Sequence, residues 1–186
     1  MSLLTIHLEN HPESAEIVQD FNAISKFLGE LGVEFERWSA TCELDADADQ
    51  EDVLSAYAMQ VEFLQSRFGF KSVDVIAITP DHPQKQQMRE KFLSEHTHDD
   101  FEVRFFVEGS GLFYLHPDEN VYAVLCEKGD LISVPANTKH WFDMGANPNL
   151  KCIRLFTTPE GWVAEFTGNL IANYFPTYEQ YLKEYA

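Results

Sequence analysis

The sequence lacks the features that would place the protein in a membrane or on nucleic acid. No apolar run approaches the roughly 18 residues of a membrane span, and the first residues, MSLLTIHLENHPE, lack the basic and apolar regions of a signal peptide. Basic residues are few, since 13 Lys and Arg stand against 31 Asp and Glu and give a net charge of −18. This charge disfavours binding to phosphate backbones and to anionic membranes.

Cysteine is scarce as well. Cys42, Cys126 and Cys152 lie far apart and form neither a CxxC motif nor a disulfide framework. We therefore expect free thiols, inert in the core for the last two, and a reducing, cytoplasmic location. The 186 residues suffice for one domain with a sizeable core. The surplus acidic charge opposes self-contact and predicts a monomer.

Two kinds of pattern follow each other along this single domain. In residues 1–95, apolar residues at helical spacing predict two amphipathic helices that open the chain, over residues 17–31 and 53–68, and a short helix over residues 84–93. Strands are expected at residues 33–38 and 73–78. In residues 96–170, short apolar runs alternate with turn signals such as Gly109-Ser110-Gly111, a spacing typical of an antiparallel sandwich or barrel. Residues 171–186 predict a docking helix whose tyrosines pack.

One short segment carries residue types that bind metals. His96 and His98 are separated by one residue, so both side chains point to the same face of an extended strand. Glu102 shares their parity if Asp99 and Asp100 do not break the alternation. Imidazole nitrogens and a carboxylate oxygen are suitable ligands for a borderline divalent ion. A structural pair of histidines would give the same HxH pattern, so the surrounding residues decide.

Those surrounding residues resemble the two motifs of the cupin superfamily. The matching positions are His96, His98, Glu102 and Gly109 in the first motif, and Gly129, Pro135 and His140 in the second. Three positions depart, where Glu90, Asn137 and Met144 stand in place of Gly, Gly and Asn. Asn can adopt the left-handed conformation that a glycine supplies. The resemblance implies a mainly β fold, the double-stranded β-helix or jelly-roll barrel of cupins, with the N-terminal helices packed outside.

Longer stretches are similar to the acireductone dioxygenases within that superfamily. They are residues 91–98 (KFLSEHTH), 102–109 (EVRFFVEG), 131–135 (LISVP), 140–145 (HWFDMG), 153–156 (IRLF) and 159–162 (PEGW). This resemblance, strong from about residue 73 to 170, implies one divalent metal per chain, Fe²⁺ or Ni²⁺. The implied ligands are His96, His98, Glu102 and His140. A closed zinc site with the same four ligands and a purely structural role is the alternative.

Two arginines are candidate catalytic residues. Arg104 lies two residues after Glu102 and points into the barrel if the strand is regular. A buried guanidinium needs an anion, and an acidic side chain would serve Arg104 or Arg154 as well as a substrate would. The resemblance implies that both arginines orient an anionic substrate.

The resemblance also implies the substrate and the reaction. The substrate is 1,2-dihydroxy-3-keto-5-methylthiopentene, which O₂ cleaves to 4-methylthio-2-oxobutanoate and formate in the iron form. The nickel form gives 3-methylthiopropionate, formate and carbon monoxide. The aromatic residues implied to hold the methylthio arm, each equally compatible with core packing, are Phe92, Phe142 and Trp162.

Two other functions remain open at this point. A metal cupin that isomerises or epimerises a sugar would need a proton-shuttling base, and no His or Tyr stands out for that role. A non-catalytic cupin that binds a small ligand often lacks one or more metal ligands, whereas all four are present here. The other histidines lie in edge or turn contexts and are expected at the surface: His7, His11, His82 and His116.

Overall fold

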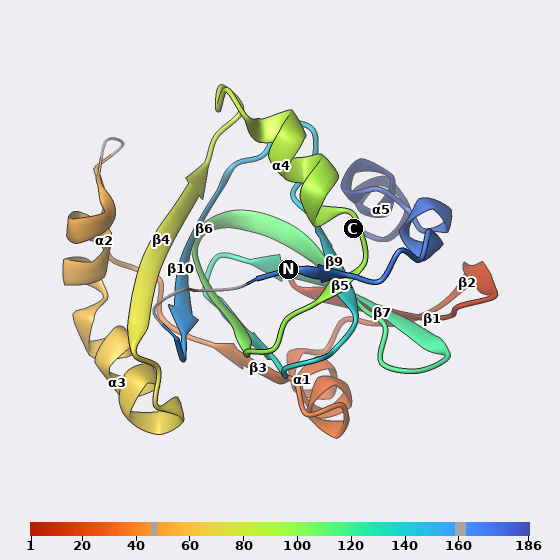
Figure 1. The fold of residues 1–186 in the computed structure, drawn as a ribbon, viewed down its shortest axis with the longest axis horizontal. Helices are drawn as coiled ribbons and strands as arrows, with labels where there is room; N and C mark the ends of the chain where they lie inside the picture. Colours follow the sequence, from red (N-terminus) through yellow and green to blue (C-terminus); the bar gives the residue numbers. More distant parts are fainter. Residues whose placement is uncertain (46–47, 159–162) are drawn as a thin grey trace.

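The computed structural model describes residues 1–45, 48–158 and 163–186 of the chain. Within these residues, antiparallel strands close into a barrel-like body with helices around its outside (Figure 1). The strands are β1 (Leu3–Leu8), β2 (His11–Val18), β3 (Glu34–Arg37), β4 (Ser72–Ile78), β5 (His96–Thr97), β6 (Glu102–Leu115), β7 (Asn120–Glu127), β8 (Asp130–Val134), β9 (His140–Asp143), β10 (Leu150–Phe156) and β11 (Glu165–Phe166). The mainly β fold expected from the sequence is confirmed.

The long strand β6 joins the two halves of the sheet. Its first part pairs with β10 and β8, which in turn pair with β4 and β3. Its second part pairs with β7 and β9, in the order β11-β5-β9-β6-β7-β1-β2. Strands from residues 1–95 are therefore part of the same sheet as the later strands, since β1 pairs with β7, β3 with β8 and β4 with β10.

A β-bulge in β6 changes which side chains face the barrel interior. Opposite β10, the register moves from Lys151–Glu108 to Cys152–Phe106, so two residues of β6 face one residue of its partner. Before the bulge, even-numbered residues such as Glu102 and Phe106 face inward. After it, odd-numbered residues such as Phe113 take that side. The bulge therefore lets one strand line the interior in both halves.

Gly109 lies where β6 passes from one half to the other. Its φ of +70° is in the left-handed region, and a Cβ there would lie 1.7 Å from the carbonyl oxygen of Asn149. The sequence predicts a break between two strands at Gly109-Ser110-Gly111. That prediction was wrong, because β6 continues through these residues as one strand. Gly109 permits the close approach of the backbone at Asn149.

Helices cover the outer faces of the two halves. They are α1 (Phe21–Glu30), α2 (Gln50–Ala56), α3 (Ala58–Phe68), α4 (Lys85–Phe92) and α5 (Tyr178–Tyr185), with a 3₁₀ turn at Ile171–Tyr174. In Figure 1, α2 and α3 lie beside β4, and α5 lies at the opposite end of the molecule. Val53 and Leu64 pack with Phe105 of β6. Tyr181 packs with Trp141 of β9, so the C-terminal helix lies against the barrel.

The N-terminal helices differ from the predicted ones. The chain opens with the hairpin β1–β2, and Ile17 lies in β2 rather than in a helix. Helix α1 begins only at Phe21, because the side chain of Asp20 accepts a hydrogen bond from Ala23 N and caps it. The helix expected over residues 53–68 is two helices, interrupted at Tyr57, whose ring is fully buried. No helix in the described ranges is long and apolar enough to cross a membrane.

Gly109→Ala should destabilise the protein far more than Gly69→Ala. Both glycines have φ near +70°, which costs an alanine about 1–2 kcal/mol. A Cβ at Gly69 meets nothing within 4 Å, whereas one at Gly109 meets backbone atoms of Asn149 and Leu150. We expect a further loss of about 1–3 kcal/mol at Gly109, measured by urea unfolding. Equal losses in the two variants would contradict the close approach.

Candidate metal centre

Four side chains meet inside the barrel. His96 lies on β5, His98 follows it, Glu102 begins β6 and His140 begins β9. The pairing of His96 with His140 across β5 and β9 brings the distant histidine to the HxH segment. All four residues are buried, with exposed fractions of 2–6%. One donor atom from each lies within 4.8 Å of the others.

Each imidazole of the cluster is oriented by a backbone carbonyl. The Nδ1 atoms of His96, His98 and His140 lie 2.6, 2.9 and 2.8 Å from the carbonyl oxygens of Ser94, Val163 and Thr138. A carbonyl oxygen only accepts, so each Nδ1 carries the proton. The Nε2 atoms are left for a ligand, and this arrangement is typical of histidines that bind metals.

Glu102 is the charged group at the centre of the cluster. Its Oε2 lies 2.9 Å from Nε2 of His140 and 3.1 Å from Nε2 of His98, while Arg104 Nε donates to Oε1 at 2.8 Å. Burial favours the protonated acid, but Arg104 and the imidazoles outweigh it and hold the pKa of Glu102 well below its usual range. Glu102 is therefore an ionised carboxylate.

The histidines respond to this charge in different ways. Burial and the neighbouring His140 lower the pKa of His96 to about 4. Burial also disfavours the charged form of His98, but the hydrogen bond to Glu102 outweighs it and raises the pKa of His98. His96 thus presents a neutral Nε2, the form in which imidazole binds a metal.

These donors fit a divalent transition metal. Ligand distances of about 2.1 Å from a central ion place donor atoms about 3–4 Å apart, and the four donors lie within 4.8 Å of one another. Nitrogen-rich sets with one carboxylate suit iron, nickel and zinc rather than magnesium or calcium. The cluster opens onto a cavity, which leaves room for further ligands.

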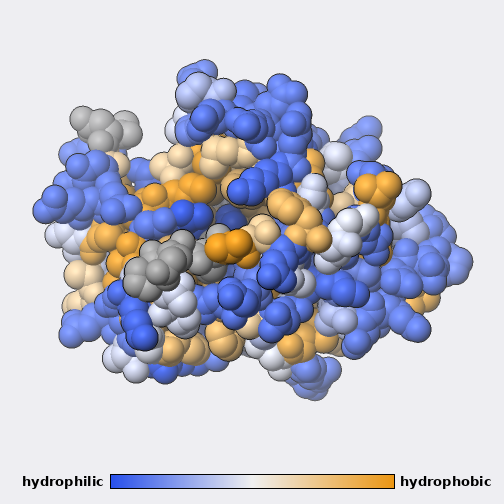
Figure 2. Space-filling model, in the orientation of Figure 1, coloured by the Kyte–Doolittle hydropathy of each residue, from blue (hydrophilic) through white to orange (hydrophobic). Residues whose placement is uncertain are grey.

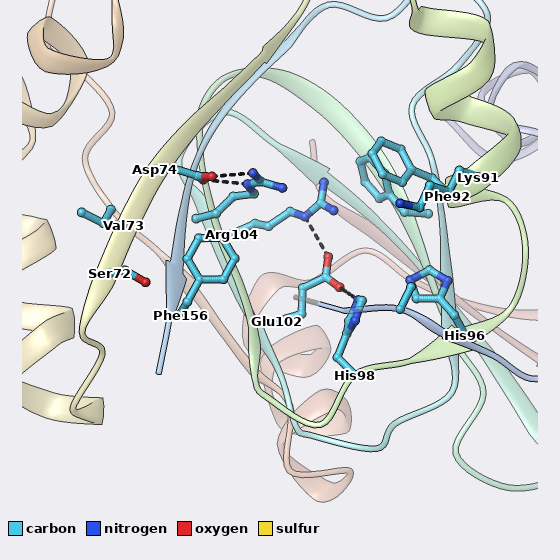
Figure 3. A pocket seen from close by; sticks show the side chains of 13 residues that line it. Ser72, Val73, Asp74, Lys91, Phe92, His96, His98, Glu102, Arg104 and Phe156 are labelled. Atoms are coloured by element: carbon cyan, nitrogen blue, oxygen red, sulfur yellow. Dashed lines mark hydrogen bonds and ion pairs between the residues drawn. The ribbon is translucent and has the colours of Figure 1, made fainter. Parts of the chain in front are cut away.

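That cavity, of about 360 Å³, is walled by β4, α4, β6 and β10 and contains His96, His98 and Glu102 on one side. Figure 3 shows these three side chains converging, with Arg104 pointing towards Glu102. On the surface, hydrophobic side chains lie around a hollow near the centre of the view, and the outer parts of this face are mostly hydrophilic (Figure 2). The volume of the cavity is that of a small-molecule site.

Both candidate arginines line this cavity. Arg104 is buried, as the regular strand predicted, and its guanidinium carbon lies 4.5 Å from the centre of the Phe142 ring. Arg154 donates two hydrogen bonds to Asp74, from Nε at 2.8 Å and from a terminal nitrogen at 2.6 Å. Each arginine thus has an acidic partner within the chain and a place in the cavity wall.

Two of the three candidate aromatic residues are also in the wall. Phe92 of α4 and Phe142 of β9 line the cavity, and their ring centres lie 6.3 Å apart. The third, Trp162, is outside the described residues. Sequence reasoning missed Lys91, Asp74 and Phe156, which also line the cavity. The exposed Lys91 adjoins Phe92, so it was within reach of the motif, whereas Asp74 is brought in only by the pairing of β4 with β10.

Two other expectations about histidines were wrong. His7 and His116 are 1% and 2% exposed, not surface residues. His7 bonds Thr5 Oγ1 and the carbonyl oxygen of Pro12, and His116 bonds two glutamates, so both satisfy their polar atoms inside the protein. Cys126 and Cys152 are buried free thiols as expected, and burial raises the pKa of Cys152 to about 12.

A centre of three imidazoles and one carboxylate inside an antiparallel β-barrel defines a metal-binding cupin. Comparison with known proteins narrows the class. The chain belongs to the ARD/ARD' family, whose model matches residues 4–164.

Known acireductone dioxygenases match this chain over most or all of its length. An acireductone dioxygenase of Methylococcus capsulatus is 62% identical over 186 residues, which cover 100% of both chains. One of Aquifex aeolicus is 56% identical and covers 93% of this chain and 96% of its own. The solved acireductone dioxygenase of Bacillus anthracis, with a cadmium ion in its active centre, superposes with a TM-score of 0.79 at 32% identity. That match covers 89% of this chain and 98% of the other.

Replacing any one ligand by alanine should lower the bound metal sharply, because each supplies one of four donors. Elemental analysis of His96→Ala, His98→Ala, Glu102→Ala and His140→Ala measures this. His11→Ala is the matched control, since His11 lies at the surface. Full occupancy in His140→Ala would remove that residue from the ligand set.

Proposed function

We propose that this protein is an acireductone dioxygenase of methionine salvage that cleaves 1,2-dihydroxy-3-keto-5-methylthiopentene with O₂. The observation that carries the proposal is the four-ligand cluster of His96, His98, Glu102 and His140, which opens onto a cavity with two guanidinium groups. The full-length similarity to acireductone dioxygenases supports the same activity.

One divalent ion per chain, Fe²⁺ or Ni²⁺, would be held by His96, His98, Glu102 and His140. When bound, such an ion would supply a Lewis acid that stabilises the negative charge of an enediolate. The iron form would give 4-methylthio-2-oxobutanoate and formate. The nickel form would give 3-methylthiopropionate, formate and carbon monoxide.

The charges of the cavity suit an anionic substrate. Lys91, Arg104 and Arg154 line it together with the acids Asp74 and Glu102, so cations outnumber anions among the described residues of the lining, although the chain as a whole carries −18. A cleft with a local positive field attracts anions even when the surrounding protein repels them. We assign Arg104 and Arg154 to binding and orienting the enediolate.

Asp74 and Glu102 hold these two arginines in place. The two parallel hydrogen bonds to Asp74 fix the plane of the Arg154 guanidinium. Arg104 donates its Nε to Glu102 and stacks on Phe142, which holds its guanidinium in the cavity wall. A planar guanidinium fixed in this way has a defined orientation toward a bound anion.

The apolar part of the cavity accounts for the other end of the substrate. Phe92, Phe142 and Phe156 supply aromatic surface beside the charged groups. We assign Phe92 and Phe142 to the methylthio arm, since burying an apolar arm against rings removes both from water. Trp162 is proposed for the same role on the motif alone.

The competing functions lack support in the cavity. Among the described residues that line it, the only imidazoles are His96 and His98, and no tyrosine is present. A sugar isomerase would therefore have no histidine or tyrosine base among these residues apart from the ligand set. Anaerobic binding of the acireductone followed by oxygen uptake distinguishes the dioxygenase from both alternatives, because only the dioxygenase consumes O₂.

Arg104→Lys and Arg154→Lys should keep the metal but lower kcat/KM by about 10- to 100-fold, since an ammonium cannot reproduce the guanidinium fork. This corresponds to about 1.4–2.8 kcal/mol of transition-state stabilisation. Steady-state kinetics and metal analysis measure both effects. Arg67→Lys, which alters a surface ion pair with Glu34 and Glu36, is the control. Unchanged kinetics in both cavity variants would refute the assignment.

The products should depend on the metal. One preparation of apoprotein, split and reloaded, should release carbon monoxide with nickel and the keto acid with iron. Both ions suit a ligand set of three imidazoles and one carboxylate. Headspace gas analysis and product chromatography under identical substrate and oxygen decide the matter. Identical products would mean that residues outside the four ligands fix the site of cleavage.

A further inference from the structure

A second buried polar cluster lies directly behind the metal ligands. Glu95, the residue before His96, is 2% exposed and is not among the described residues that line the cavity. Its Oε2 accepts a hydrogen bond from Nδ1 of His116 at 2.6 Å, and its Oε1 accepts one from Thr167 Oγ1 at 2.6 Å. A buried polar group is costly unless it is hydrogen-bonded, and these side chains satisfy one another. A hydrogen-bonded pair directly beside the ligands therefore points to a role in their placement.

The histidine of this cluster connects His96 to His140. The backbone N–H of His116 donates to the carbonyl oxygen of Lys139, which immediately precedes His140. The residue before His116, Leu115, is the cross-strand partner of His140. One residue thus bonds the positions that precede two of the ligands, Glu95 through its side chain and Lys139 through its backbone.

The threonine of the cluster connects Glu95 to the segment that orients His98. The backbone N–H of Thr167 donates to the carbonyl oxygen of Glu95 at 3.1 Å. Thr167 directly follows β11, which pairs with β5. Val163, four residues earlier, supplies the carbonyl oxygen that accepts from Nδ1 of His98. Loss of the hydrogen bonds between Thr167 and Glu95 would loosen the segment whose Val163 carbonyl orients the His98 ring.

The far side of the His116 ring is also held. Its Nε2 lies 3.0 Å from Oε2 of Glu9, which follows β1. With a carboxylate at each ring nitrogen, the imidazole has one orientation that serves both contacts. The hydrogen bond from Glu9 N to the carbonyl oxygen of Glu119 fixes that end of β1 in turn.

We infer that Glu95 and His116 form a positioning pair for the metal centre, and that Thr167 supports this pair through its hydrogen bonds to Glu95. The pair touches neither metal nor substrate. It sets the spacing of His96 and His140 and holds the segment that orients His98. This inference rests on the metal site of the proposed function.

The test measures nickel affinity rather than activity. His116→Leu should raise the dissociation constant for Ni²⁺, determined by competition with a chelator, by about 10- to 100-fold, the usual effect of losing a group that orients ligands. His116→Asn, which keeps an N–H near the position of Nδ1, should recover most of the affinity. Thr167→Val, which removes one hydroxyl at nearly constant volume, should give a smaller loss of the same sign.

His7→Leu is the matched control. His7 is equally buried and hydrogen-bonded at both ring nitrogens, but it lies on β1, on the opposite side of β7 from β6. We expect it to lower the melting temperature of the metal-free protein and to leave the Ni²⁺ dissociation constant within about twofold of wild type. The visible spectrum of the Co²⁺-loaded protein should change in His116→Leu and not in His7→Leu.

Three outcomes would overturn the inference. One is a folded His116→Leu variant with wild-type Ni²⁺ affinity and an unchanged Co²⁺ spectrum, which would make the pair merely structural. If His116→Leu does not fold, wild-type affinity in Thr167→Val has the same meaning. A wild-type protein that binds no Ni²⁺ would overturn the proposed metal site itself and this inference with it.

Discussion

The ionised carboxylate of Glu102 is the constraint on which the site depends. A buried charge is tolerated only when its partners compensate the loss of water. Glu102 obtains this compensation from His98 and Arg104, which are near it in sequence, and from His140 of β9. The same carboxylate thereby fixes the HxH segment, the start of β9 and the guanidinium in the cavity wall. In the proposed function, metal ligation and substrate orientation would depend on this one anion.

The rest of the fold keeps that carboxylate and its partners in register. Strand alternation places Glu102 and Arg104 on the inner face of β6, while Val103 and Phe105 pack under α2 and α3 on the outer face. The bulge opposite Cys152 then reverses the parity, so Phe113 lines the interior in the second half. The contacts of β6 with α2 and α3 are apolar, so they contribute packing and offer no polar group that would pair with the charged side chains inside.

Charge is distributed unevenly over this protein. The chain carries −18, yet the cavity wall holds Lys91, Arg104 and Arg154 against Asp74 and Glu102. The acidic surface favours solubility, and the local cations attract an anionic substrate into the cavity. Behind the ligands, Glu95 and His116 form a separate polar cluster out of contact with the cavity. The interior therefore has two polar clusters, and apolar packing surrounds them.

The sequence by itself determined the fold class and indicated the candidate ligands, because the motifs that carry the family resemblance are contiguous in the chain. His96 and His98 form one HxH segment, Glu102 begins the next strand, and the motif around His140 is equally short. Even the left-handed turn at Asn137, with φ of +62°, was predictable from its residue type. The burial of His7 and His116, the Asp74–Arg154 pair and the single strand across Gly109 were not. Only the tertiary structure decided these, because they depend on which distant strands pair, and a residue's own neighbours in sequence do not encode that.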